Sequence, residues 1–139
     1  MATTTAQITL TSTDIADNAV SISNTMTLTT AGTETGITET TGLARKKVAS
    51  ASLADLITVA NTDVTAAKSA KVYIKNTSTA TDKYGLIGIG DSSGTPIYIG
   101  RLYGGDWMLF PWDANSGEDI TLTMSDATET IIEYMVFFE

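Results

Sequence analysis

The sequence predicts an all-β fold, an antiparallel β-sandwich or jelly roll, on three observations. Thr fills 26 of the 139 positions, and β-branched residues suit a pleated sheet better than a helix. Several short stretches alternate apolar and polar residues with a period of two. Turns rich in Gly and Asp separate these stretches at near-regular spacing, which is typical of sandwiches and barrels. A chain of this length is expected to form a single domain over residues 1–139.

The first 44 residues are rich in Thr and contain the clearest alternation. Between residues 20 and 28, Val20, Ile22, Met26 and Leu28 share one parity with Asn24, whereas Ser and Thr take the other, and this predicts a half-buried strand. Ile8 and Leu10 predict a shorter strand before it, and the Gly-containing stretch 31–44 is expected to be extended or looped. Residues 1–44 are therefore either a pair of ordinary strands or an arm that extends onto a neighbouring molecule.

Arg45, Lys46 and Lys47 form the only run of like charge. One interpretation is an edge strand, because lysines on sheet edges prevent unwanted pairing. The other is a contact with an acidic neighbour, and the sequence favours neither.

Residues 53–60 are ambiguous. Ser52 and Asp55 have the spacing of a capping box, and apolar residues follow at helical intervals, which predicts one short helix near 53–60. The segment Leu56 to Ala60 fits a strand equally well, since so short an apolar run does not fix the period.

The second half of the chain predicts a series of strands near 71–75, 84–89, 97–102, 107–110, 120–124 and 131–138. Gly104 and Gly105 supply the conformational freedom of a tight hairpin turn between Tyr103 and Asp106, with Trp107 opening the returning strand. Aromatic residues are dense from Tyr98 to Trp112. In such strands they belong more often to a core or a subunit interface than to a sugar-binding site.

The last strand carries apolar residues on both faces. Ile132, Tyr134, Val136 and Phe138 form one face, yet Met135 and Phe137 lie on the other, beside Glu133 and Glu139. A strand of this kind is expected to be covered on both sides, either within a sandwich or by another chain.

The composition removes most catalytic equipment. The chain has no Cys and no His, which excludes disulfides, thiolate metal sites, cysteine nucleophiles and Ser-His dyads. Oxygen ligands alternate from Asp113 to Asp119 as in calcium loops, but the glycine is one place early and no flanking helices are expected, so a turn is favoured and a bound cation is left open. We therefore predict no catalytic, cofactor-binding or metal-binding residues and no enzyme activity.

The charge is unevenly distributed along the chain. Residues 1–44, 45–101 and 102–139 carry net charges of −4, +4 and −8, which sum to −8. An acidic chain is a poor partner for nucleic acid, and no apolar run approaches the roughly 20 residues of a membrane-spanning helix. The asymmetry either averages out over the folded surface or brings complementary charges together between neighbouring copies. Without an export signal, synthesis in a host cytoplasm is expected.

Three segments carry a family resemblance: KVYIKNTSTATDKYGLIGIG, IYIGRLYGGDWMLFPWDA and the closing IIEYMVFFE. Together with GLARKKVAS they resemble small virion structural proteins of tailed bacteriophages, especially of cyanophages and other marine phages. The likeness covers about residues 43–139. It implies a virion component, often an all-β capsid decoration or cement protein or an accessory part of the tail, and it implies no catalytic residue.

We therefore predict a capsid decoration protein that binds the outer head surface and bridges shell subunits. Its expected partners are the major capsid protein and copies of itself, for which a trimer is one option, with no nucleic acid and no membrane. The alternative is a tail accessory or a receptor- or glycan-binding module that stacks sugars on Tyr98, Tyr103, Trp107 and Trp112. The predicted assembly interface consists of Arg45, Lys46, Lys47, Tyr103, Trp107, Trp112, Met135 and Phe137.

Overall fold

The computed structural model describes residues 4–14, 19–28, 37, 39–49, 51–62, 64, 70–115 and 117–139. Over these residues the chain forms eleven strands and one 3-10 turn, and every strand pairing is antiparallel. The predicted all-β class is confirmed. The jelly-roll alternative is not confirmed by the strand orders.

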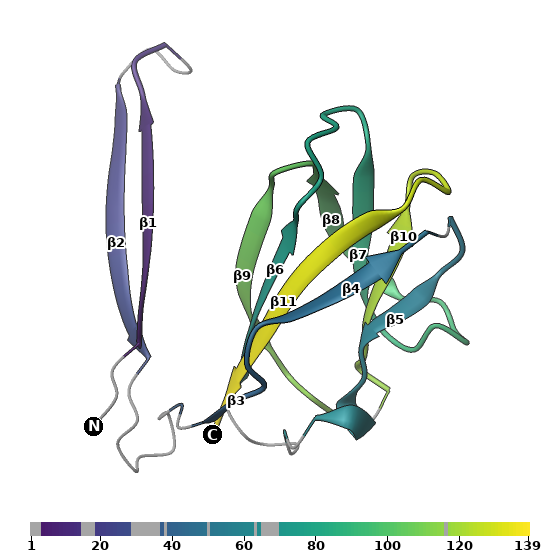
Figure 1. The fold of residues 1–139 in the computed structure, drawn as a ribbon. Coiled ribbons are helices and arrows are strands. Elements are labelled where there is room, and N and C mark those ends of the chain that lie inside the picture. Colours follow the sequence, from purple (N-terminus) through teal and green to yellow (C-terminus); the bar gives the residue numbers. More distant parts are fainter. Residues whose placement is uncertain are drawn as a thin grey trace.

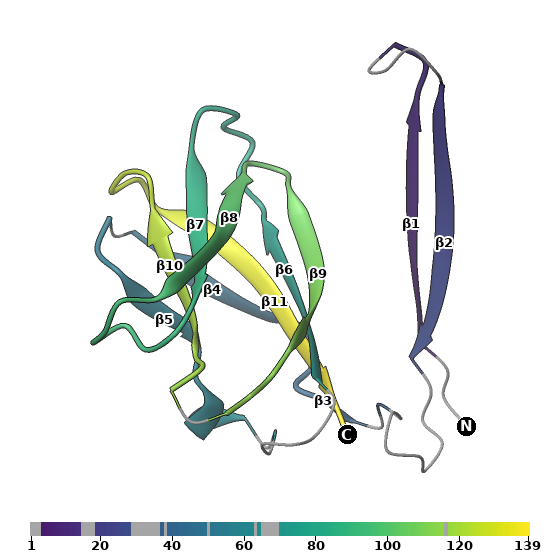
Figure 2. The same ribbon diagram turned by 180° about the vertical axis from the view of Figure 1, so that it is seen from behind.

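The N-terminal strands form a sheet of their own. β1 (Thr4–Ser12) pairs with β2 (Val20–Leu28) in continuous register, so the two strands predicted in the Thr-rich region are confirmed. Among the described strands, neither pairs with a third. This two-stranded hairpin is the purple and blue ribbon of Figures 1 and 2.

The remaining strands form two sheets that face each other as a sandwich (Figures 1 and 2). The four-stranded sheet has the order β5-β10-β7-β8, formed by Ala54–Ile57, Ile120–Met124, Tyr84–Ile89 and Ile97–Tyr103. The five-stranded sheet has the order β3-β11-β6-β9, formed by Glu39–Thr40, Thr130–Phe138, Ala70–Asn76 and Trp107–Trp112. Its fifth strand, β4 (Ala44–Val48), also pairs with β11.

The core lies between these two sheets. Alternation of side chains sends every second residue of β6 and β10 inward, and Ile74, Ile120 and Leu122 are almost fully buried there. Trp112 belongs to the same core, with 3% of its surface exposed, and its indole Nε1 donates to the carbonyl oxygen of Glu118 at 2.8 Å. Burial of this kind is the dominant stabilising term of the sandwich.

The helix predicted near residues 53–60 is wrong, and the alternative strand over Leu56 to Ala60 is right only for its first two residues. Ala54–Ile57 forms β5 against β10, and only Val59–Asn61 makes a 3-10 turn. Asp55, the second residue of the predicted capping box, has another role: its carboxylate accepts from the backbone N–H and the hydroxyl of Ser92, at 3.0 and 2.8 Å. These bonds hold β5 to the turn after β7, so tertiary contacts decide against the helix.

The turn from Tyr103 to Asp106 exists, but the hairpin predicted around it does not. β8 pairs with β7 in one sheet and β9 pairs with β6 in the other, so the turn crosses between sheets. Asp106 N donates to Tyr103 O at 3.0 Å, and Tyr103 N donates to the Asp106 carboxylate at 2.9 Å. The sequence pattern is the same for a hairpin and for this corner.

In the described part of the chain, no helix has the length and apolar character needed to cross a membrane.

Candidate assembly surfaces

The outer face of the five-stranded sheet is the first candidate surface. Register places side chains from three adjacent strands on it in rows: Met135 lies opposite Tyr73, which lies opposite Leu109. In the next row, Phe137 lies opposite Lys71, which lies opposite Pro111. Met135 and Phe137 are half-buried among these neighbours. The apolar second face of the last strand is therefore part of a wider apolar surface, which we call the outer face.

Basic side chains border the outer face. Lys71 and Lys75 lie on it from β6, and Arg45 and Lys47 lie on it from β4. Arg45 pairs with Glu133 at 2.9 Å, and Lys47 pairs with Glu129 at 2.6 Å. The Lys47–Glu129 pair is largely exposed and adds little to stability, whereas the Glu133 side chain of the other pair is only 13% exposed. Glu133 and Glu129 thus offset two of the four bases, and the outer face is still more basic than a chain of net charge −8 is on average.

The outer face also perturbs one titratable group. Partial burial, followed by the charge of Glu133 and a hydrogen bond to its carboxylate, raises the pKa of the Tyr73 hydroxyl. The phenol is thus held in its neutral form, which suits a surface of half-buried apolar character.

Five of the eight predicted interface residues share the outer face: Arg45, Lys47, Trp107, Met135 and Phe137. Lys46 does not, because alternation turns it to the opposite side of β4, where the residue is still exposed and its amino group donates to the carbonyl oxygen of Asp55. Trp112 is in the core and is not a surface contact in this structure. Tyr103 belongs to the other sheet.

The second candidate surface is an aromatic cluster on that other sheet. Tyr84 lies opposite Tyr103 on adjacent strands, with ring centroids 5.3 Å apart and a tilt of 58°. The Arg101 guanidinium lies 4.6 Å from the centroid of the Tyr84 ring, a cation–π contact. Tyr98 and Tyr103, both in β8, are among the exposed large apolar residues. Stacking surfaces of this kind can bind planar or sugar-like groups.

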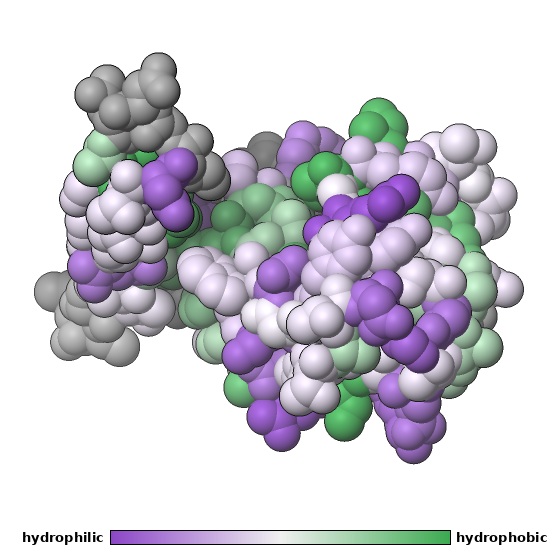
Figure 3. All heavy atoms as spheres, turned by 90° about the horizontal axis from the view of Figure 1, so that it is seen from above, coloured by the Kyte–Doolittle hydropathy of each residue, from purple (hydrophilic) through white to green (hydrophobic). Residues whose placement is uncertain are grey.

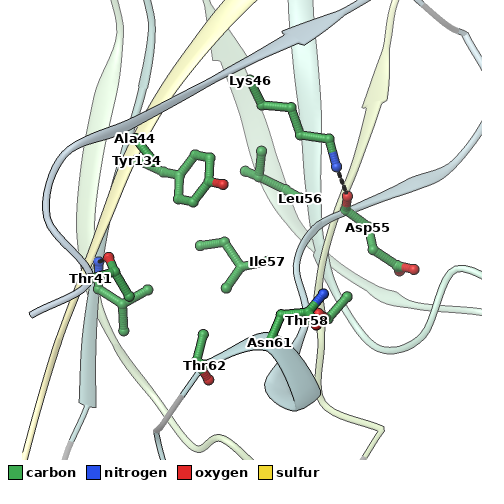
Figure 4. Close-up of a pocket in the computed structure, with 11 residues that line it drawn as sticks. Thr41, Ala44, Lys46, Asp55, Leu56, Ile57, Thr58, Asn61, Thr62 and Tyr134 are labelled. Carbon is green, nitrogen blue, oxygen red and sulfur yellow. Dashed lines mark hydrogen bonds between the residues drawn. The ribbon is translucent and has the colours of Figure 1, made fainter.

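A cleft of about 440 Å³ opens between β4 and β5, where the edges of the two sheets approach without pairing (Figure 4). The Tyr134 ring projects into it from β11, and the Lys46 side chain spans its rim to the Asp55 backbone (Figure 4). The Asp55 carboxylate is turned away and is occupied by Ser92. The lysine and the carboxylate therefore do not face each other as an acid–base pair.

The loop from Asp113 to Asp119 forms a turn in its described residues, 113–115 and 117–119. Glu118 N donates to Asn115 O at 3.0 Å, and the Asp119 carboxylate accepts from Val59 N at 2.8 Å. That carboxylate thus holds the 3-10 turn after β5. Within the part of the chain that the structure describes, no three His, Cys, Asp or Glu side chains cluster as metal ligands would.

Sequence reasoning missed Lys71, Tyr73, Lys75, Leu109 and Pro111 as parts of the outer face. Their alternation marked β6 and β9 as strands with a second face. Joining them to Met135 and Phe137 requires the knowledge that β6 lies between β11 and β9, and no local pattern contains that order.

Comparison with known proteins finds no matching family model, no matching curated protein and no matching solved structure.

Proposed function

We propose that this protein is a structural component of a tailed-phage virion, a decoration protein that binds the outer surface of the head and bridges adjacent shell subunits. The observation that carries the proposal is the outer face. Protein interfaces typically have an apolar centre and a polar rim. The outer face combines Met135, Phe137 and Leu109 at its centre with basic residues around them.

The charge of the outer face favours a partner of opposite charge. An acidic protein that gathers bases on one apolar face is suited to an acidic and partly apolar surface, because complementary charge steers association and sets orientation. The resemblance of residues 43–139 to virion structural proteins supports a shell subunit as that partner. The engagement of Asp55 and Lys46 in structural hydrogen bonds supports a binding role over a catalytic one.

A second candidate function is a receptor- or glycan-binding module on the tail, and the aromatic cluster favours it. Tyr98 and Tyr103 are exposed on the four-stranded sheet, and Arg101 and Tyr84 lie beside Tyr103. Trp107 is exposed as well, but on the outer face of the other sheet. Trp112 cannot stack on a sugar in this structure, because it is buried. Saturable quenching of Trp107 fluorescence by a host polysaccharide supports the glycan function, whereas a flat response across a panel leaves the decoration function ahead.

Immunogold labelling of purified phage particles with an antibody against this protein tests the proposal directly. We expect gold over the whole head. Gold confined to the tail overturns the decoration function and supports the second candidate. Absence of the protein from intact particles contradicts both.

A further inference from the structure

We propose that the β1–β2 hairpin is a self-association element, through which copies of this chain join their hairpins edge to edge around a shared apolar core. The inference deepens the proposed assembly role by naming an element and a partner. It concerns the purified chain alone, so its failure and the failure of the virion function are separate results.

The first argument is that the hairpin exposes apolar side chains and lacks a third strand. Ile8, Leu10, Ile22 and Met26 are 43%, 50%, 44% and 40% exposed, although they lie on one face of a regular sheet. A two-stranded hairpin alone is marginally stable in water and needs a third strand or a packed layer. No further described strand supplies either one. Leu28, at the end of this face, is already buried. The rest of the apolar face therefore needs a cover that the described strands do not supply.

The second argument is the two-faced pattern. Cross-strand pairs such as Leu10 with Ile22 and Ala6 with Met26 alternate with pairs such as Thr9 with Ser23. One side of the hairpin is mostly apolar, with Thr4, Ser12 and Asn24 as its polar residues, and the other is Thr, Ser and Gln. When hairpins pair side by side, alternation keeps all apolar residues on one side of the enlarged sheet. That side closes on itself as a core and leaves the hydroxyl side in water.

The third argument is the state of the strand edges. Free edges are normally protected by charge or proline against pairing with other chains. The edge strands of the sandwich follow this rule: Glu39 in β3, Arg45 in β4, Asp55 in β5, Arg101 in β8 and Pro111 in β9. β1 and β2 are nine residues long and contain no charge and no proline. Unprotected edges of that length indicate that pairing with another chain is their native state.

Charge identifies the partner as a second copy. The chain carries a net charge of −8, so copies repel one another over most of their surface. The two hairpin strands contain no charged residue. In the space-filling view, which looks onto one end of the hairpin, pale residues lie beside a few strongly hydrophilic ones (Figure 3). An uncharged surface cannot select a foreign protein by charge. This surface can be recognised through the unpaired edge of a strand and through its aliphatic side chains. The hairpin of another copy has both features, with the same strand length and the same alternation.

The test measures the oligomeric state of the full chain by light scattering after size exclusion. We expect wild type to give a multiple of the 14.6 kDa protomer mass. Leu10→Lys with Ile22→Lys charges one cross-strand pair on the apolar face and should give monomers. The matched control, Thr9→Lys with Ser23→Lys, adds the same charge to the adjacent pair on the hydroxyl face and should stay oligomeric. Near-UV circular dichroism checks that the sandwich remains folded in each.

A second experiment does not depend on the apolar-face variant and therefore still tests the proposal if that variant unfolds. It measures hydrogen exchange of the wild-type protein at decreasing concentrations. Outward-pointing amides of β1 and β2 should exchange slowly in the oligomer and at least tenfold faster at concentrations where it dissociates, while β6 amides stay protected. A monomeric wild type at high micromolar concentration overturns the proposal. So does an apolar-face variant that remains oligomeric, or hairpin exchange that does not depend on concentration.

Discussion

The side-chain amide of Asn76 donates to the main-chain carbonyl oxygen of Leu102 at 3.0 Å, so the last residue of β6 in one sheet holds β8 in the other. Its Oδ1 accepts from Ser78 N at 3.0 Å, and its backbone exchanges hydrogen bonds with the turn, as Gly105 N donates to Asn76 O and Asn76 N donates to Asp106 O. Asn76 is fully buried. One side chain thus fixes the corner at which the chain passes from β8 to β9.

We expect Asn76→Ala to lower the free energy of unfolding by about 2–4 kcal/mol, because it leaves Leu102 O and Ser78 N without their partner in a buried corner. Urea unfolding followed by circular dichroism measures the loss. Asn115→Ala, at an exposed position, serves as the control and should change stability by less than about 0.5 kcal/mol. Equal losses in the two variants contradict the role given to Asn76.

Gly104 is required at the same corner for steric reasons. A Cβ at this position collides with the backbone carbonyl oxygens of Ser78 and Ala80, which cannot move aside as a flexible side chain can. We expect Gly104→Ala to destabilise the protein by roughly 1–3 kcal/mol. Gly100→Ala in β8, whose Cβ meets nothing within 4 Å, is the matched control and should be close to neutral. Thermal unfolding of both variants decides the matter.

Local patterns predicted the strands well and their partners poorly. The alternation in Val20–Leu28 and in β11 located strands and their faces, because side-chain period is a local property. The Tyr103 to Asp106 turn looked like a hairpin, but only the hydrogen bonds of Asn76 with residues distant in sequence turn it into a corner between sheets. The aromatic stretch predicts Trp112 at an interface, but the residue is buried in the core. This burial depends on which sheet β9 joins, and the local sequence does not contain that information.

Ionisation of Tyr73 should lower stability at alkaline pH. The folded state raises the pKa of this phenol by burial and by the charge of Glu133, so above the unfolded value of 10.0 the unfolded state binds fewer protons than the folded state. This stabilising contribution is complete below that pH and is lost as pH rises through the folded pKa. Unfolding of wild type and Tyr73→Phe, compared at about pH 9 and about pH 11, isolates it. An identical pH dependence in both proteins argues against the shift.

The two tryptophans should differ in fluorescence. Trp107 is 50% exposed on the outer face, whereas Trp112 is 3% exposed in the core. We expect acrylamide to quench Trp107→Phe several-fold less than Trp112→Phe, with a bluer emission from the remaining Trp112, because burial excludes the quencher. Equal quenching of the two single-tryptophan proteins contradicts the placement of Trp112 in the core.

Removing the apolar centre of the outer face should abolish binding to the head while leaving the fold intact. Met135→Ser with Phe137→Ser replaces two half-buried side chains on the outer side of β11, and the inward side with Ile132 and Val136 is untouched. Co-sedimentation with phage heads stripped of this protein should fall at least tenfold, since each apolar contact at an interface centre can carry 1.4 kcal/mol or more, that is, about tenfold in affinity. The control is Ile97→Ser, an exposed apolar residue in β8 of the other sheet, which should bind almost normally. Undiminished binding by the double variant removes the outer face as the contact. Unfolding of that variant instead assigns Met135 and Phe137 to the fold.

The same double variant should keep the oligomer mass of the wild type, because self-association is assigned to the hairpin and head binding to the outer face. A double variant that becomes monomeric contradicts this division of roles.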